Sequence, residues 1–101
     1  MATKEVKIGD HTYRLFGETM YIHTPVEQLT EIMDLAVHWF NTRSLGWLLM
    51  HTTATAVDND IVRCRFNEDL DSLNSALDHP LESMTLELDF ELKHAYMSFY
   101  Y

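Results

Sequence analysis

The chain has 101 residues, of which 47% are hydrophobic. This size and composition are typical of a single folded domain, which we expect over residues 1–101. The longest apolar run, at residues 45–50, is far below the roughly 20 residues of a membrane-spanning helix, and the first residues lack the apolar core of a signal peptide. Because the lone Cys64 cannot form an intramolecular disulfide, we expect a cytoplasmic protein.

The charge of the chain is strongly acidic and unevenly distributed. The formal net charge at pH 7 is −9. Six acids and four bases give −2 for residues 1–56, and ten acids and three bases give −7 for residues 57–101. Direct binding to nucleic acid is not expected, since neutralising phosphates requires an excess of Lys and Arg. The acidic half favours either a basic macromolecular partner or simple solubility.

Two turn-forming dipeptides divide the first 24 residues. Gly9-Asp10 and Gly17-Glu18 separate three runs that are rich in β-branched and aromatic residues. The sequence therefore predicts a meander of three short strands over residues 6–8, 12–16 and 19–23.

The next segment has the signature of a helix N-terminus. Thr24 can accept a hydrogen bond from a free helical amide, Pro25 needs no amide partner in the first turn, and Glu27 can bond back to the Thr24 amide. Apolar residues at helical spacing follow, so we expect a helix over residues 25–42.

The apolar stripe of this helix is wider than one contact with a sheet requires, because it includes Ile32, Leu35 and Trp39. Something else must cover this flank. The alternatives are the N-terminal hairpin, folded back, and a second copy or another partner.

The second half of the chain predicts a hairpin, a helix and a long strand. Strands over residues 47–57 and 61–66 flank a turn at Asp58-Asn59-Asp60. Asn67 can cap a helix over residues 68–78, which Pro80 ends. Strict alternation of apolar and polar residues then predicts a strand over residues 84–93.

The expected fold is α+β. Counted from Thr19, the order β-α-β-β-α-β is the ferredoxin-like arrangement, preceded by an N-terminal β-hairpin over residues 4–16. Two helices would cover one face of an antiparallel sheet. The other face would carry Tyr21, His23, Arg63, Arg65, Glu87, Asp89 and Glu91.

Glu87, Asp89 and Glu91 form a row of carboxylates on one face of the last expected strand. One interpretation is a docking strip for a basic partner, with charges arranged like those of a phosphate backbone. The other is a solvated sheet face that Arg63, Arg65 and Lys93 neutralise through cross-strand pairs.

The C-terminal segment is unusually aromatic, and its candidate partner-binding residues are Tyr96, Phe99 and Tyr100. Chain termini are normally polar and frayed. The segment could continue the last strand after a bulge near residues 93–94 and pack on the core. It could instead form an interface, where aromatic side chains supply contact area, or act as an edge strand that pairs with a second copy.

The six histidines show no spacing typical of a metal site, and we expect neither a metal nor a cofactor. His23 and His51, in expected strands, could converge with Glu87 or Asp89 as an acid/base pair. Cys64 alternates with Val62 and Phe66, which indicates an inert core thiol.

These observations support two hypotheses of function, and neither rests on a catalytic motif. The first is a small acidic inhibitor or adaptor that docks on a basic surface of another macromolecule, for example a nucleic-acid-binding protein, in the manner of immunity proteins and phage-encoded blockers of nucleic-acid enzymes. Homodimer formation is compatible with it. The alternative is a small enzyme or ligand-binding domain on a dimeric ferredoxin-like sheet, with a histidine/carboxylate cleft.

Overall fold

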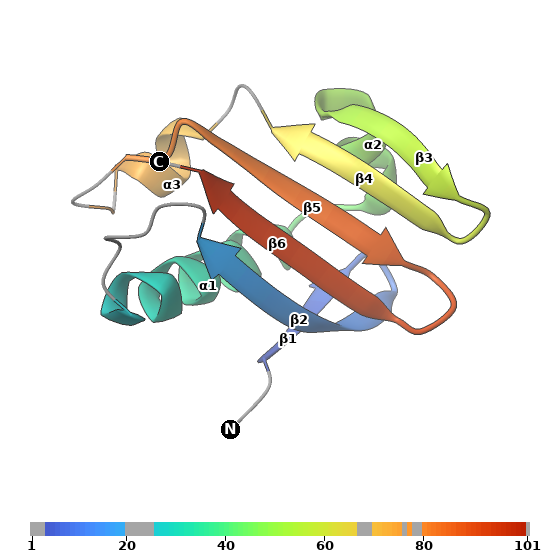
Figure 1. Ribbon diagram of the computed structural model, residues 1–101, viewed down its shortest axis with the longest axis horizontal. Coiled ribbons are helices and arrows are strands. Elements are labelled where there is room, and N and C mark those ends of the chain that lie inside the picture. The colour runs from blue at the N-terminus through green and yellow to red at the C-terminus, as the bar shows by residue number, and fades with distance from the viewer. Residues whose placement is uncertain (1–3, 20–25, 67–69, 76, 78–79, 101) are drawn as a thin grey trace.

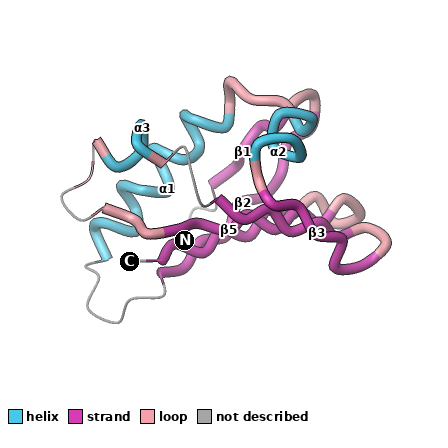
Figure 2. The backbone as a smooth tube through the Cα atoms, turned by 90° about the horizontal axis from the view of Figure 1, so that it is seen from above, coloured by secondary structure: helices cyan, strands magenta, loops and turns pink. Residues whose placement is uncertain are grey.

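The structure is a computed structural model that describes residues 4–19, 26–66, 70–75, 77 and 80–100. It contains a mixed six-stranded sheet with helices on one side, as Figures 1 and 2 show. In chain order the elements are β1 (Lys4–Ile8), β2 (His11–Thr19), α1 (Val26–Phe40), α2 (Leu45–His51), β3 (Thr53–Asp58), β4 (Ile61–Phe66), α3 (Asp71–Asn74), β5 (Ser83–Asp89) and β6 (His94–Tyr100).

The strands lie in the order β1-β2-β6-β5-β4-β3. Every neighbouring pair is antiparallel except β2 and β6, which run parallel. The C-terminal strand is therefore central, and β1 and β3 form the two edges of the sheet (Figure 1).

The core lies between the sheet and the helices. Alternate residues of the central strands point towards the helical layer and are almost completely buried, as the period of two in a strand requires. These residues are Tyr13, Leu15, Cys64, Phe66, Met84, Leu86, Leu88, Ala95, Met97 and Phe99. Helix α1 contributes Ile32, Ala36 and Phe40, and α2 contributes Leu48.

The α+β class is confirmed, but the ferredoxin-like strand order is wrong. The expected last strand ends at Asp89, and the chain returns as β6, which enters the sheet between β2 and β5. The sheet therefore has an additional strand and a parallel pair that the ferredoxin-like arrangement does not have. The turn at residues 90–93 contains no Gly or Pro, which is why the sequence did not reveal it.

The expected turn at Gly17-Glu18 is also absent, because β2 continues through it to Thr19. Parallel pairing with β6 extends the strand, with Glu18 opposite Ser98 and Thr19 opposite Phe99. Gly17 allows close approach of α1, since a Cβ atom at this position would lie 2.7 Å from Met33 Sδ. The remainder of the expected strand at residues 19–23 lies outside the described residues.

Residues 47–57 do not form one strand, because their first part belongs to helix α2. Ser44 caps this helix, and its hydroxyl accepts a hydrogen bond of 3.1 Å from the amide of Trp47. The unbranched residues that follow suit a helix, and the β-branched residues from Thr52 onward suit the strand β3.

The two expected helices are present with shorter described ranges. Helix α1 ends at Phe40, and the expected cap at Thr24 and Pro25 lies outside the described residues. Helix α3 spans four residues, and its expected cap, Asn67, is not described.

The wide flank of α1 is covered within the chain. Ile32 and Trp39 are buried, and the Trp39 ring makes edge contacts with those of Trp47 and Phe66. Lys4 of the hairpin forms an ion pair with Asp34 of α1. The N-terminal hairpin and α2 therefore cover this flank of α1. A second copy or another partner, the alternative considered from the sequence, is not needed to cover it.

Candidate functional site

The face of the sheet opposite the helices is not covered by any described element, as Figure 1 shows with this face towards the viewer. We call it the open face. Its side chains come from strands β2 to β6 and include Arg14, Phe16, Glu18, Thr53, Thr55, Ile61, Arg63, Arg65, Ser83, Thr85, Glu87, Asp89, His94, Tyr96, Ser98 and Tyr100.

The register of the strands arranges these side chains in rows across the sheet. One row runs from Phe16 through Tyr96 and Glu87 to Arg63. The next row runs from Glu18 through Ser98 and Thr85 to Arg65. Residues that are up to 80 positions apart in the sequence are thus neighbours, and Ser98 Oγ donates a hydrogen bond of 3.2 Å to Glu18.

Three rings, those of Phe16, His94 and Tyr96, form an aromatic patch on the open face. The Phe16 and Tyr96 rings stack with centroids 5.3 Å apart, and the His94 ring lies edge-on to Phe16 at 5.2 Å. His94 Nδ1 is 3.0 Å from the Tyr96 hydroxyl. Phe16 and Tyr96 remain 36% and 41% exposed. Partly exposed, mutually supported rings are typical of the centre of a protein interface.

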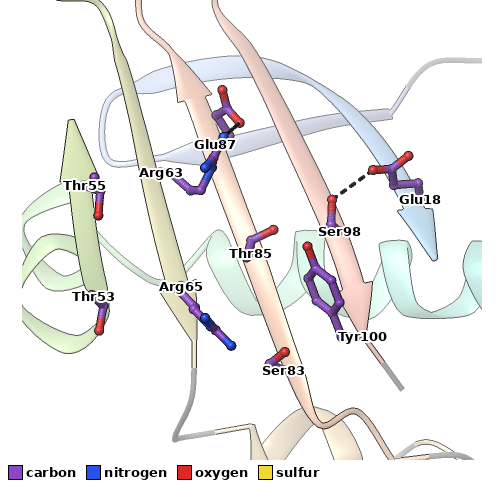
Figure 3. A pocket seen from close by; sticks show the side chains of 10 residues that line it. All are labelled: Glu18, Thr53, Thr55, Arg63, Arg65, Ser83, Thr85, Glu87, Ser98 and Tyr100. Atoms are coloured by element: carbon purple, nitrogen blue, oxygen red, sulfur yellow. Dashed lines mark hydrogen bonds and ion pairs between the residues drawn. The ribbon is translucent and has the colours of Figure 1, made fainter. Parts of the chain in front are cut away.

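Beside the aromatic patch the open face is hollowed into a shallow depression of about 710 Å³. Figure 3 shows that Arg63 and Arg65 of β4 project over it among hydroxyl groups of β3, β5 and β6. Arg63 forms an ion pair of 3.3 Å with Glu87. Within the described ranges, no residue forms an ion pair with Arg65.

The central strands β2, β6, β5 and β4 carry equal numbers of acidic and basic residues on the open face. The acids are Glu18, Glu87 and Asp89, and the bases are Arg14, Arg63 and Arg65. The excess of acids that makes the net charge −9 therefore lies outside this part of the sheet.

The open face contains four of the six residues that the sequence indicated for partner binding. Glu87, Asp89, Tyr96 and Tyr100 share it. Glu91 lies in the turn after β5, so the expected row of three carboxylates is not continuous. Phe99 lies on the opposite side of β6 and is completely buried, so it belongs to the core.

The carboxylates that remain in the row are already engaged. Glu87 pairs with Arg63, as the neutralising interpretation expected. One oxygen of Asp89 accepts hydrogen bonds from the amides of Glu91 and Leu92. Asp89 therefore holds the turn, and its carboxylate is not a free binding group.

The histidine/carboxylate cleft is not brought together by the described residues. His51 lies at the end of α2, in the helical layer, where its ring stacks on Trp47 at 4.8 Å. His23 lies outside the described residues. Among the residues that are described, no group of three His, Cys, Asp or Glu side chains could hold a metal ion.

The sequence did not indicate Phe16, Glu18 or His94 as site residues. Phe16 alternates with the buried Leu15, so an outward position was visible in the pattern of β2. The pairing of Phe16 with Tyr96 was not visible in the sequence, because no local signal pairs β2 with the C-terminal strand.

Comparison with protein-family models, with characterised proteins and with solved structures finds no match to this chain. In the part of the chain that the structure describes, no helix is long and apolar enough to cross a membrane. The arrangement of the open face is therefore the basis for any statement about function.

Proposed function

We propose that this protein is a small acidic binding protein, an adaptor or inhibitor, that docks on a basic surface of another protein through its open face. The observation that carries the proposal is the aromatic patch on an uncovered sheet, where the Phe16 and Tyr96 rings stack on one another and stay partly exposed. Aromatic side chains at the centre of an interface supply much of its binding energy.

The charge of the chain supports a basic partner. Because the acid excess lies outside the central strands, it acts as a long-range field that attracts a basic protein before contact. The open face, with balanced charges, then supplies the short-range contacts. Glu18 and Glu87 flank the aromatic patch, and their bonds to Ser98 and Arg63 use one carboxylate oxygen each. The second oxygen of each can accept a hydrogen bond from Lys or Arg of the partner. A nucleic-acid-binding protein is a partner of this chemistry.

The test begins with isolation of the partner on immobilised protein and measurement of its association rate. Replacing Phe16 and Tyr96 by Ala should weaken binding by at least about tenfold, which corresponds to loss of one modest hot spot. The association rate of the unaltered protein should fall as salt shortens the Debye length, about 8 Å at physiological ionic strength.

A matched pair of charge reversals separates the site from the overall field. Changing Glu18 and Glu87 to Lys alters the net charge as much as changing Glu31 and Asp34 of α1 to Lys. We expect both pairs to slow association and only the open-face pair to increase the dissociation rate as well. Equal dissociation rates for the two variants, or full affinity after loss of both rings, would show that the partner binds elsewhere.

The depression beside the patch favours a second candidate, binding of a small anionic ligand. Two arginines among the hydroxyls of Thr85, Ser83 and Tyr100 are suited to a phosphate or carboxylate group. This candidate corresponds to the ligand-binding hypothesis from the sequence, but its polar groups are arginines instead of the expected histidines. Titration with inorganic phosphate or citrate should shift the amide resonances of β3 and β4 in the unaltered protein and not in Arg65→Ala. Absence of any shift in the unaltered protein would exclude this candidate.

A further inference from the structure

The two edge strands of the sheet differ in their protection against pairing with another chain. Strand β1 carries Lys4, Glu5 and Lys7, and charged side chains are a common way to protect an edge. Strand β3 is exposed at every position and has no charged residue before Asp58. Its Thr and Val residues have high β propensity, and the strand contains no Pro.

The unprotected edge continues into an exposed apolar surface. Thr52 alone joins α2 to β3, and the last turn of α2 presents Leu49 and Met50, which are 43% and 82% exposed. Val57 of β3 is 46% exposed. Most of the large hydrophobic side chains elsewhere in the described chain are buried, so this surface stands out as one that favours a partner.

We propose that β3 pairs antiparallel with β3 of a second copy of this chain, so that the two sheets join across a two-fold axis. An interface of this type must be self-complementary, since the same surface occurs on both sides. A pairing centred on Thr55 places Thr55 opposite its copy and Ala54 opposite Ala56. Small and β-branched side chains then face each other, and no like charges meet.

Charge complementarity at the ends of the paired strands also favours a second copy. Thr53 is the register partner of Arg65 in β4. In the pairing centred on Thr55, Thr53 lies opposite Val57 of the second copy, and Asp58 of that copy is the next residue along the strand. A bulge between Ala56 and Asp58 places Asp58 opposite Ile61, on the side of the sheet that carries Arg65. Two strand spacings, about 10 Å, separate Arg65 from the partner strand, and the long side chain of Arg65 covers most of this distance towards the short side chain of Asp58.

The pairing has a consequence for the open face. Both copies would present this face on the same side of one continuous sheet, so a dimer would offer two aromatic patches to a partner. The net charge of −9 on each copy opposes association, but charges farther apart than the Debye length of about 8 Å are largely screened at physiological salt.

Sedimentation velocity over a range of protein concentration at physiological salt tests the proposal without any partner. The unaltered protein should show a monomer–dimer equilibrium. Thr55→Lys brings two ammonium groups face to face and should weaken the dimer by about fivefold or more. Thr12→Lys is the matched control, because it makes the same change at an exposed position of β2 and should dimerise like the unaltered protein.

A charge swap tests the pairing of strand ends. Arg65→Glu and Asp58→Lys should each weaken the dimer, and the double variant should recover it. A general charge effect would instead make Asp58→Lys strengthen the dimer, because this change lowers the net negative charge. Hydrogen exchange of the unaltered protein gives a measurement that needs no variant. The amides of β3 should become more protected as concentration rises.

A protein that is monomeric at all concentrations, or β3 amides whose exchange does not depend on concentration, would overturn the proposal. So would equal dimerisation of Thr55→Lys and Thr12→Lys. Binding at the open face is measured separately, so a monomer that still requires Phe16 and Tyr96 for its partner would leave the proposed function in place.

Discussion

Asp89 ends strand β5 with its carboxylate turned onto the following residues. Its Oδ1 atom accepts hydrogen bonds from the amides of Glu91 and Leu92 at 3.0 and 2.9 Å. Side chains of Asp and Asn stabilise turns in this way. The turn has no Gly, and Lys93 adopts a φ of 56°, so these bonds hold a backbone that is otherwise unfavourable.

We therefore expect Asp89→Ala to lower the free energy of unfolding by about 1 kcal/mol, the value of one typical hydrogen bond. Asp89→Asn keeps an acceptor and should change it much less. Denaturant midpoints of the two variants provide the comparison. If Asp89→Ala and Asp89→Asn lowered the free energy of unfolding equally, the negative charge of Asp89 rather than its hydrogen-bond acceptor would stabilise the turn.

Two buried titratable groups, Tyr13 and Cys64, make stability sensitive to alkaline pH. Burial raises the pKa of Tyr13 above its ordinary value of 10.0. Burial also raises the pKa of Cys64, and a hydrogen bond with Thr52 opposes this effect. In both cases the neutral form is favoured in the folded state, so unfolding becomes easier once the unfolded chain can ionise.

The contribution of each group is complete below its unfolded pKa and is lost as pH rises through the folded one. We expect the denaturant midpoint to fall above about pH 9. At pH values above the ordinary tyrosine pKa, the denaturant midpoint of Tyr13→Phe should fall less than that of the unaltered protein. A fall of the same size in the Tyr13→Phe variant would assign it to other groups.

Strand β6 presents two aromatic residues to opposite sides of the sheet. Phe99 is completely buried and Tyr96 is 41% exposed. Replacement of a buried Phe by Ala typically costs about 3–5 kcal/mol, so Phe99→Ala should destabilise the fold severely. Tyr96→Ala should have a small effect on thermal unfolding and a large one on partner binding. If Tyr96→Ala had a lower melting temperature than Phe99→Ala, the assignment of Phe99 to the buried side of β6 and of Tyr96 to the exposed side would be wrong.

Gly17 places β2 close to α1, and a Cβ atom there would lie 2.7 Å from Met33 Sδ and 3.1 Å from its Cγ. Gly17→Val should destabilise by about 1–3 kcal/mol, the usual effect of overpacking. Met33→Ala removes the obstructing atoms, so the valine should be tolerated better in that background. Additive effects in the double variant would show that Met33 is not the obstacle.

At the scale of the whole molecule, the charge is arranged so that the central strands are balanced and the excess of acids lies around them. Self-repulsion of a net charge of −9 destabilises the compact state, and salt screens it. We expect the melting temperature to rise with NaCl between low and physiological ionic strength. A variant with Glu31→Gln and Asp71→Asn should gain less from salt. A melting temperature that does not depend on salt would mean that local ion pairs dominate.

The sequence predicted several local features of this fold well. The hairpin at residues 58–60 forms as expected between β3 and β4, and Gly9, with a φ of 63°, lies in the turn between β1 and β2. Alternation correctly identified the buried side of β5, and the apolar stripe correctly identified α1. These features depend on residues close together in the chain, where spacing and turn chemistry carry the information.

What the tertiary structure alone decided is which strands are neighbours. Alternation in residues 94–100 shows that one side of a strand is buried, but the same pattern fits an edge and a central strand. The place of β6 between β2 and β5 depends on contacts such as Glu18 with Ser98, 80 positions apart. That pairing buries Phe99, joins Phe16 to Tyr96 and leaves β3 as an open edge. Long-range packing chooses among pairings that local sequence treats as equivalent, because each strand edge offers the same backbone hydrogen bonds.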